Sequence, residues 1–350
     1  MKKKNLENLQ VNEKDLEVQT LMEKALSLMN ENDFMQALKI LKETDEKYPE
    51  RYVVLMNLGS VYYYLQDYNK SINYYARAAE INDSSFELHY NLGNAYAETG
   101  NIEKAKTHYE TALELAPDSA VVCNALGMLM QDSLQFPQSV AYYEKAVKYA
   151  PGRVDYLKNL AAAYQKSGMK NEAIYNYLKY LKEVPYDENA LFCVAQAYAD
   201  LKDSENAETY FLKAIDARPD YYNAIIAYAL FLVDEGRFER ADEMFKTAME
   251  KQPENKKAYI LRADMAVAGT DYDYALKMYN KAEELGADHG VFIKKANVLM
   301  ATGNYEEGIK YYKKASDAAP QIKDTKLLFF EAVKKYLKEK YKEEINLERI

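Results

Sequence analysis

Apolar and polar positions alternate along this chain with the periodicity of short amphipathic helices, and the helices come in pairs. Residues 86–119 show the unit. Leu92, Gly93 and Tyr96 fall at helical spacing on one face of a first helix, where the glycine lets a neighbouring helix approach closely. A Gly-Asn pair at residues 100–101 then breaks this helix.

A second helix follows in the same unit. Ala105, Tyr109 and Ala112 recur at helical spacing, and Pro117 ends the helix because proline lacks a backbone donor and restricts the residue before it. Small residues of one helix and large residues of the other suit two antiparallel helices that interdigitate. One such hairpin cannot bury its own apolar face, so the pattern requires neighbouring copies.

The unit recurs without a change of phase over residues 18–255, and two further units follow at residues 256–288 and 289–322. The first seven units begin at Val18, Tyr52, Phe86, Ala120, Val154, Glu188 and Tyr222. Their first helices keep a small residue at one position: Ala25, Gly59, Gly93, Gly127, Ala161, Ala195 and Ala229. Their second helices keep a large one: Leu41, Tyr75, Tyr109, Tyr143, Tyr177, Phe211 and Phe245.

This spacing resembles the tetratricopeptide repeat (TPR), whose units of about 34 residues carry Leu-Gly, Tyr, Ala, an aromatic, Ala and Pro in this order. The resemblance covers residues 18–322 and implies an all-α fold, a right-handed α-solenoid superhelix of antiparallel helix pairs. In this family the first helices line a concave groove that commonly holds an extended peptide or a helix of a partner. The unbroken period favours one elongated array over the two or three globular domains that length alone suggests.

The segments outside the repeats carry their own patterns. Residues 1–17 are polar with scattered leucines and predict either a frayed tail or a short helix. Residues 323–350 predict one long helix, whose apolar stripe would cover the last repeat as a capping helix. A dimerising helix is the alternative for this segment.

The eighth unit departs most from the pattern. It lacks the closing proline and places Arg262 where earlier units have leucine or valine, and Lys295 takes that place in the ninth unit. Because a buried unpaired cation is costly, we expect each side chain to reach water or to meet a carboxylate. If the array has a hinge or a change of curvature, we expect it here, with ordinary repeat divergence as the alternative.

Charge and cysteine usage narrow the partners and the compartment. A net charge of -9 and a pI near 5.2 disfavour nonspecific attraction to nucleic acid or to anionic membranes. Residues 1–10 start basic but lack the apolar run of a signal peptide, and no stretch approaches the ~20 apolar residues of a membrane span. Cys123 and Cys193 lie two repeats apart, too far for a disulfide. We expect a cytoplasmic protein with protein or peptide partners.

The sequence carries no pattern of catalytic residues. His89, His108 and His289 show no metal-ligand or triad spacing, and there is no glycine-rich phosphate loop or nucleophile motif. His89 and His108, on the two helices of the third unit, could approach one another, but a packing or surface role is expected. Since repeats and cap account for residues 18–350, we expect a protein that is not an enzyme and needs no cofactor or metal.

Three asparagines are the first candidates for peptide binding. Asn57, Asn91 and Asn159 each lie two residues before the small residue of a first helix, and resemble the asparagine ladder on the inner wall of some superhelical members of the family. An asparagine amide both donates and accepts, so such a row can pair with the backbone of any peptide. The fourth unit interrupts the row with Ala125. The alternative is that these asparagines cap or bridge neighbouring first helices.

Apolar residues take the inward positions nearer the C-terminus and are the second set of candidates: Phe192, Ile226, Leu230, Val233, Ile260 and Ile293. They predict a groove for an amphipathic helix or an apolar peptide, unless they pack between first helices. The two-cation clamp that binds peptide carboxylates in some members of the family is approached only by Lys158 with Asn159.

These patterns predict a protein-protein interaction scaffold or adaptor that binds a peptide or helix in its concave groove. The alternative is a permanent structural subunit of a larger assembly that uses its convex face or C-terminal cap, and a third possibility is regulation of an enzyme in trans. Fold does not choose among these roles, and the oligomeric state is not predicted.

Overall fold

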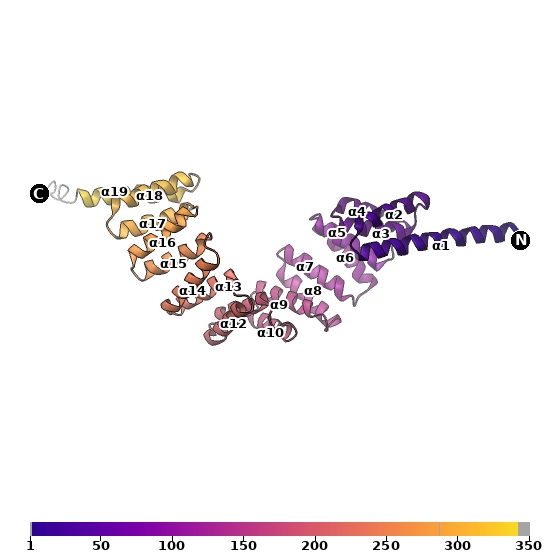
Figure 1. Ribbon diagram of the computed structural model, residues 1–350, viewed down its shortest axis with the longest axis horizontal. Coiled ribbons are helices and arrows are strands. Elements are labelled where there is room, and N and C mark those ends of the chain that lie inside the picture. Colours follow the sequence, from indigo (N-terminus) through magenta and orange to yellow (C-terminus); the bar gives the residue numbers. More distant parts are fainter. Residues whose placement is uncertain (1, 287, 342–350) are drawn as a thin grey trace. The chain divides into compact units, whose positions relative to one another are not determined.

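The computed structural model describes residues 2–286 and 288–341, with side chains from residue 14 onward, and forms 19 α-helices without a strand in this part of the chain. The helices alternate as first and second members of nine pairs, followed by α19 (Lys323–Lys340) (Figure 1). The first helices are α1 (Lys2–Asn30), α3 (Tyr52–Tyr64), α5 (Phe86–Glu98), α7 (Ala120–Asp132), α9 (Val154–Lys166), α11 (Glu188–Asp200), α13 (Tyr222–Asp234), α15 (Lys256–Ala268) and α17 (His289–Ala301). The second helices are α2 (Phe34–Lys47), α4 (Tyr68–Ile81), α6 (Ile102–Leu115), α8 (Phe136–Tyr149), α10 (Lys170–Leu181), α12 (Ser204–Ala217), α14 (Phe238–Lys251), α16 (Tyr272–Glu284) and α18 (Tyr305–Ala318).

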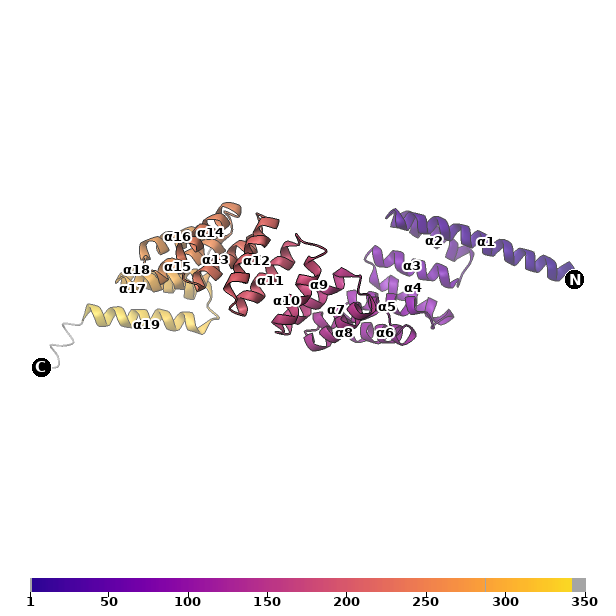
Figure 2. The same cartoon turned by 90° about the horizontal axis from the view of Figure 1, so that it is seen from below.

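The chain divides into two compact units, residues 1–183 and 184–350. The first unit holds repeats one to five, and the second holds repeats six to nine with α19 (Figure 2). Within each unit, every first helix packs on the second helix of its own repeat, and that second helix packs on the next first helix. The fold is therefore an all-α solenoid of helix pairs, as the periodicity predicts.

The turn inside each repeat is built in one way throughout the chain. A residue with positive φ ends the first helix, and the second helix begins two residues later. Glycine takes this left-handed conformation without steric cost, as at Gly100 with φ 73°. In several turns an Asp or Asn then caps the second helix by accepting a hydrogen bond from a backbone N–H three residues on: Asp33, Asp67, Asn101, Asp203 and Asp271.

The cores of repeats two, three and four contain a close contact between a tyrosine ring and a glycine. Tyr109 on α6 lies against Gly93 on α5, and the same pair recurs as Tyr75 with Gly59 and as Tyr143 with Gly127. All three tyrosine rings are buried. The interdigitation predicted from the alternation of small and large residues is thus confirmed.

Polar side chains replace the usual apolar residue of the first helix in the last three repeats. Tyr228, Arg262 and Lys295 hold equivalent places on α13, α15 and α17, and all three are buried. Each meets a carboxylate from the preceding second helix. Arg262 Nε donates to Asp242 at 2.6 Å, and Lys295 forms an ion pair with Glu283. The expectation that these two cations would reach water or pair with a carboxylate is confirmed by the pairing.

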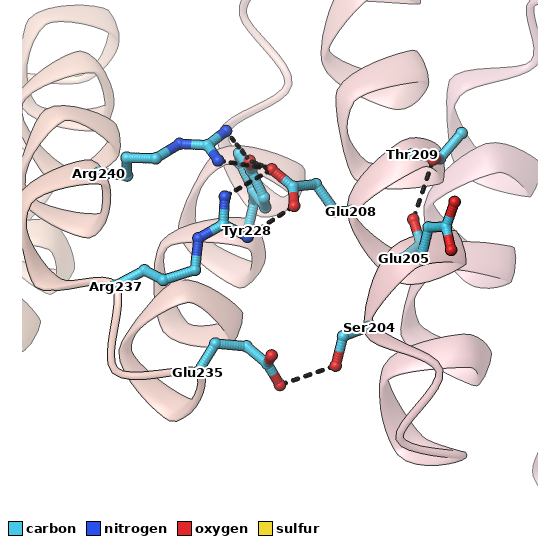
Figure 3. A network of polar contacts seen from close by, with 8 residues as sticks. All are labelled: Ser204, Glu205, Glu208, Thr209, Tyr228, Glu235, Arg237 and Arg240. Carbon is cyan, nitrogen blue, oxygen red and sulfur yellow. Dashed lines mark hydrogen bonds and ion pairs between the residues drawn. The ribbon is translucent and has the colours of Figure 1, made fainter.

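The Tyr228 contact is part of a larger network between repeats six and seven (Figure 3). Glu208 on α12 accepts a hydrogen bond from the Tyr228 hydroxyl at 2.8 Å and binds both ends of the Arg237 guanidinium, at 2.6 and 3.0 Å. Arg240 adds a second ion pair at 2.7 Å. Burial alone would raise the pKa of Glu208, but the Arg237 and Tyr228 hydrogen bonds hold it below its ordinary value.

Both terminal segments form helices. Residues 2–17, for which a frayed tail and a short helix were the alternatives, are the N-terminal part of α1, which runs unbroken into the first repeat. At the other end α19 packs on α18 through Thr325 and Ala332. The predicted capping helix covers residues 323–350, of which residues 342–350 lie outside the described part of the chain.

Candidate peptide-binding groove

The first helices α3, α5 and α7 lie side by side in the first unit, and one face of them encloses a groove of about 340 Å³. The second helix α6 also contributes to the lining, through Ile102 and Tyr109. The lining side chains come from repeats two, three and four: Tyr63, Tyr90, Asn94, Ala97, Glu98, Ile102, Tyr109, Asn124, Ala125, Met128, Leu129 and Asp132.

Tyrosine side chains are part of the lining of this groove. Tyr63 and Tyr90 come from neighbouring first helices, and the Tyr63 hydroxyl donates to Glu98 Oε1 at 3.4 Å. Burial and the nearby Glu98 carboxylate raise the pKa of Tyr63 well above its ordinary value, so its hydroxyl stays protonated at neutral pH. The rings therefore present neutral aromatic surface to whatever enters the groove.

Two asparagine amides project into the same groove. The carbonyl oxygen of Asn94 accepts the Tyr109 hydroxyl at 2.7 Å, and that of Asn124 accepts the Asn159 amide at 2.9 Å. These bonds orient both side chains from below. They also engage the oxygen of each amide, and the Asn124 nitrogen donates in turn to Met128 Sδ at 3.5 Å. An amide nitrogen carries two protons, so each of the two side chains keeps at least one for a ligand.

The charge of the groove has one sign. Glu98 and Asp132 end α5 and α7 at equivalent places, and both are exposed. None of the lining residues is a lysine or arginine. A cation that enters the groove would therefore meet two carboxylates and no competing positive charge among the lining residues.

The three asparagines predicted to form a ladder are in three different situations. Asn57 donates to the Val53 carbonyl of its own helix at 2.7 Å. Asn159 bridges to Asn124 on the preceding first helix. The side chain of Asn91 is half-buried and makes no hydrogen bond within the described residues. Peptide binding by this row stays a prediction, and the bridging alternative describes Asn159.

The apolar residues predicted for the second unit lie mostly against its cores. Ile226 is only 2% exposed and belongs to the core cluster around Phe211, against which Phe192 and Val233 also pack. Leu230 is the most open of the set at 38% exposure. The remaining two are half-buried and pack on later clusters: Ile260 and Ile293. An apolar groove through these residues stays a prediction.

A hollow of about 460 Å³ does lie between α15 and α17 in the second unit. Its lining includes Asp264, Lys294 and Asn297, but none of the three predicted isoleucines. Lys294 Nζ pairs with Asp264 Oδ2 at 2.6 Å, so the two charges in this hollow already satisfy one another. This hollow is therefore a weaker candidate site for a charged ligand than the groove of the first unit.

The sequence analysis did not single out the residues that line this groove: Tyr63, Tyr90, Asn94, Glu98 and Asp132 are not among its candidates. The signal that could have found them is their shared register: Glu98 and Asp132 lie one repeat apart. Over the described ranges, no three ligating side chains gather to hold a metal ion, and no helix has the length and apolar character to cross a membrane.

Comparison with known proteins agrees with this architecture. The fold defines the class, an α-solenoid of helix hairpins. Protein-family models described as "Tetratricopeptide repeat" match residues 86–119, 189–221, 229–289 and 290–322, and one described as "TPR repeat" matches residues 59–100. Together these matches cover more than half of the chain, which belongs to the tetratricopeptide repeat family. A search of the curated proteins finds no significant match.

Two solved structures illustrate the likeness. The C-terminal part of a TPR repeat-containing protein from Cytophaga hutchinsonii is 19% identical and has a TM-score of 0.60, with 68% of this chain and 97% of that chain covered. A tetratricopeptide repeat protein from Parabacteroides merdae is 18% identical and has a TM-score of 0.54, with 72% and 99% covered. At such identities the likeness shows the fold alone.

Proposed function

We propose that this chain is a non-enzymatic protein-interaction module, and that the groove of repeats two to four binds an extended peptide segment of a partner that carries a lysine or arginine. The observation that carries the proposal is the pair of carboxylates, Glu98 and Asp132, beside the Tyr63 and Tyr90 rings in a groove without a cation. The tetratricopeptide fold, with its exposed faces of first helices, supports the general role.

The chemistry of the groove suits both the basic side chain and the backbone of such a segment. A guanidinium or ammonium group gains from carboxylates and from aromatic faces together, with cation–π contacts worth about 0.5–2 kcal/mol according to desolvation. The amide nitrogens of Asn94 and Asn124 can donate to peptide carbonyls of any sequence. Specificity would thus come from one basic side chain and register from the backbone.

Titration calorimetry with synthetic peptides tests this proposal. A peptide of about ten residues with a central arginine should bind, and the same peptide with citrulline at that place should bind about tenfold more weakly, because citrulline keeps the shape and loses the charge. The double variant Glu98→Gln/Asp132→Asn should remove this difference between the two peptides. Equal affinity of the wild-type protein for both peptides would reject the proposal.

A matched control separates the groove from the overall charge of the protein. Glu114→Gln/Asp118→Asn makes the same change in net charge on exposed positions of repeat three that do not line the groove. This variant should keep the preference for arginine. If it lost the preference as well, the effect would be long-range attraction to an acidic protein and not recognition in the groove.

The alternative, a permanent subunit of an assembly that uses the C-terminal cap, also has a structural feature in its favour, the exposed side of α19. Affinity capture of the intact protein over a salt series separates the two roles. Sub-stoichiometric partners that share a basic extended segment would support the adaptor role. One partner at fixed stoichiometry that survives high salt would support the permanent subunit.

A further inference from the structure

The last helix holds the place that the first helix of a tenth repeat would hold. Its buried residues Thr325 and Ala332 lie one repeat length beyond Val291 and Val298, which are buried on α17. Thr325 also closes the turn before the helix, because its hydroxyl donates to the Ile322 carbonyl at 2.7 Å. α19 thus packs on repeat nine in the register of the repeats.

The opposite side of α19 differs from every first helix before it. One repeat length beyond Ala296, where the repeats keep a glycine or alanine, the helix has Phe330, which is 66% exposed. In the repeats this place receives the ring of the second helix. Leu327, Leu337 and Tyr341 are also exposed and recur at helical spacing with Phe330, so they form one stripe.

Lysines alone supply the charge along this stripe. At 100° per residue, Lys323, Lys326, Lys334 and Lys338 fall on the same side of α19 as the exposed apolar residues, whereas its acidic residues fall on the flanks and towards repeat nine. Within the described residues none of these four lysines has an ion pair. We call this surface, Leu327, Phe330, Leu337 and Tyr341 with the four lysines, the α19 outer face.

We infer that the α19 outer face binds an amphipathic helix of a partner protein, whose acidic residues flank a ridge of small apolar residues. The partner helix takes the place that the second helix of a tenth repeat would take. Phe330 already fills the space of the ring that a second helix normally inserts, so the partner needs a small residue opposite it. Its Asp and Glu side chains pair with the lysines.

The lysines of the α19 outer face favour an acidic partner helix over a second copy of α19 and over a lipid bilayer. A second copy of α19 would bring four lysines against four lysines, which is unfavourable. A bilayer would accept the apolar residues, but Lys334 lies in the middle of the stripe and not at its margin, whereas helices that lie in membrane interfaces separate the two faces. A helix with acidic flanks satisfies the apolar residues and the lysines together.

Two designed peptides of about 18 residues test the inference with the full chain. Both have an Ala/Leu ridge at i, i+3 and i+4, one flanked by glutamates and the other by lysines. In fluorescence anisotropy the glutamate peptide should bind at least about tenfold more tightly than the lysine peptide. The variant Lys326→Glu/Lys334→Glu should reverse this preference, while Lys24→Glu/Lys39→Glu, an equal charge change on exposed positions of repeat one, should not.

The variant Phe330→Ser tests the apolar part of the α19 outer face. It should lower the affinity for the glutamate peptide about tenfold. Tyr175→Ser, at a side chain 67% exposed on α10, is the matched control and should leave affinity unchanged. Equal binding of both peptides overturns the inference. Two other results would also overturn it: binding of the protein to vesicles that contain phosphatidylglycerol, and self-association seen as concentration-dependent sedimentation. Either result counts only if Phe330→Ser abolishes it, because the effect then comes from the α19 outer face. Because Glu98 and Asp132 play no part here, a failed groove experiment leaves this test intact.

Discussion

Gly93 lies so close to Tyr109 that a Cβ atom added to it would come within 2.5 Å of the ring carbons Cδ1 and Cε1. The ring belongs to the second helix of the same repeat and is held from the other end, because its hydroxyl donates to Asn94. It cannot shift without giving up that hydrogen bond or its packing. This glycine is therefore kept by the close approach of two helices and not by a special backbone conformation.

We predict that Gly93→Ala destabilises repeat three by about 1–3 kcal/mol, because overpacking of a filled core outweighs the higher helix propensity of alanine. A linear array opens in segments, so the loss is best measured by hydrogen exchange of the α5 and α6 amides. Gly152→Ala is the control, since a Cβ there meets nothing within 4 Å. Equal protection in Gly93→Ala and in wild type would contradict the prediction.

Contacts of this kind explain why so much of the fold could be predicted from the sequence. The hairpins share one arrangement, so a small residue and a large residue at fixed spacing specify the pair of helices wherever they recur. Structural features that occur only once in the chain could not be predicted in the same way. The extension of α1 back to Lys2 and the division of the chain after Glu183 have no counterpart in the repeat pattern. A hinge at the eighth repeat stays a prediction.

The ion pair between Lys295 and Glu283 should respond asymmetrically to substitution. Lys295 is 3% exposed and also donates to the Tyr311 hydroxyl at 2.5 Å, whereas Glu283 is partly exposed and has Lys314 as a second partner. Removal of the carboxylate leaves a buried cation, and removal of the cation leaves a carboxylate that water and Lys314 still reach. We expect Glu283→Gln to lower the free energy of unfolding by about 2 kcal/mol and Lys295→Leu to leave it nearly unchanged.

Denaturant unfolding of the two variants, followed by circular dichroism, checks this prediction. Lys295→Leu is the more demanding of the two, because it restores the apolar residue that earlier repeats have at this place. Glu284→Gln, one residue away on the exposed side of α16, is the control for the charge change. Should Lys295→Leu cost as much as Glu283→Gln, the pair would contribute net stability and our reasoning on desolvation would be wrong.

The two histidines of repeat three do meet, with Nδ1 of His89 3.1 Å from Nδ1 of His108. His89 Nε2 lies 2.9 Å from the Asp83 carbonyl oxygen, and since a carbonyl only accepts, this nitrogen carries the proton. Neutral His89 therefore accepts at Nδ1, and His108 donates. The sequence suggested that the rings could approach, but their shared hydrogen bond depends on side-chain geometry.

This pair should make repeat three sensitive to mild acid. Burial and then the neighbouring His89 lower the pKa of His108 below its ordinary value of 6.5, with Asp83 opposing and Lys104 adding to the shift. The unfolded chain thus binds a proton more readily than the folded one. The stability that His108 contributes is present above pH 6.5 and is lost as the pH falls towards the folded pKa.

Thermal unfolding at pH 7.5 and 5.5 measures this effect against His108→Asn, which keeps a donor near the place of Nδ1 and does not titrate. We expect the wild type to lose more stability between the two pH values than the variant. Groups far from repeat three titrate equally in both proteins, so the difference reports on the His89–His108 pair. A variant with the same pH dependence as the wild type would show that the lowered pKa has no effect on folding.

The candidate site was less predictable than the fold, because the role of each of its side chains depends on contacts with neighbouring helices. Tyrosines such as Tyr63 and Tyr109 are expected to pack in the core, yet both line the groove, and the Tyr109 hydroxyl also holds Asn94 in place. Whether a polar side chain faces a ligand or a neighbour depends on the next helix, as Asn159 and Asn91 show. Such contacts between repeats leave no periodic trace when they occur once.

The difference between Asn91 and Asn159 leads to the last prediction. Asn159→Ala should cost about 0.5–1.5 kcal/mol of stability, because it leaves the Asn124 oxygen without its donor. Asn91→Ala should leave stability unchanged, since that amide makes no hydrogen bond in the described part of the chain. If the predicted ladder binds peptide backbone, Asn91→Ala should weaken binding of the arginine peptide severalfold.

Calorimetry on both variants, with helical content followed in parallel, separates the two roles of the asparagines. Weaker binding by Asn91→Ala at unchanged stability would support backbone recognition by the row. Unchanged affinity in Asn57→Ala/Asn91→Ala/Asn159→Ala would reject the ladder and leave the charged groove as the site of recognition. A collapse of helical content in the triple variant would instead mean that the row is structural, with the bridge from Asn159 to Asn124 as its typical member.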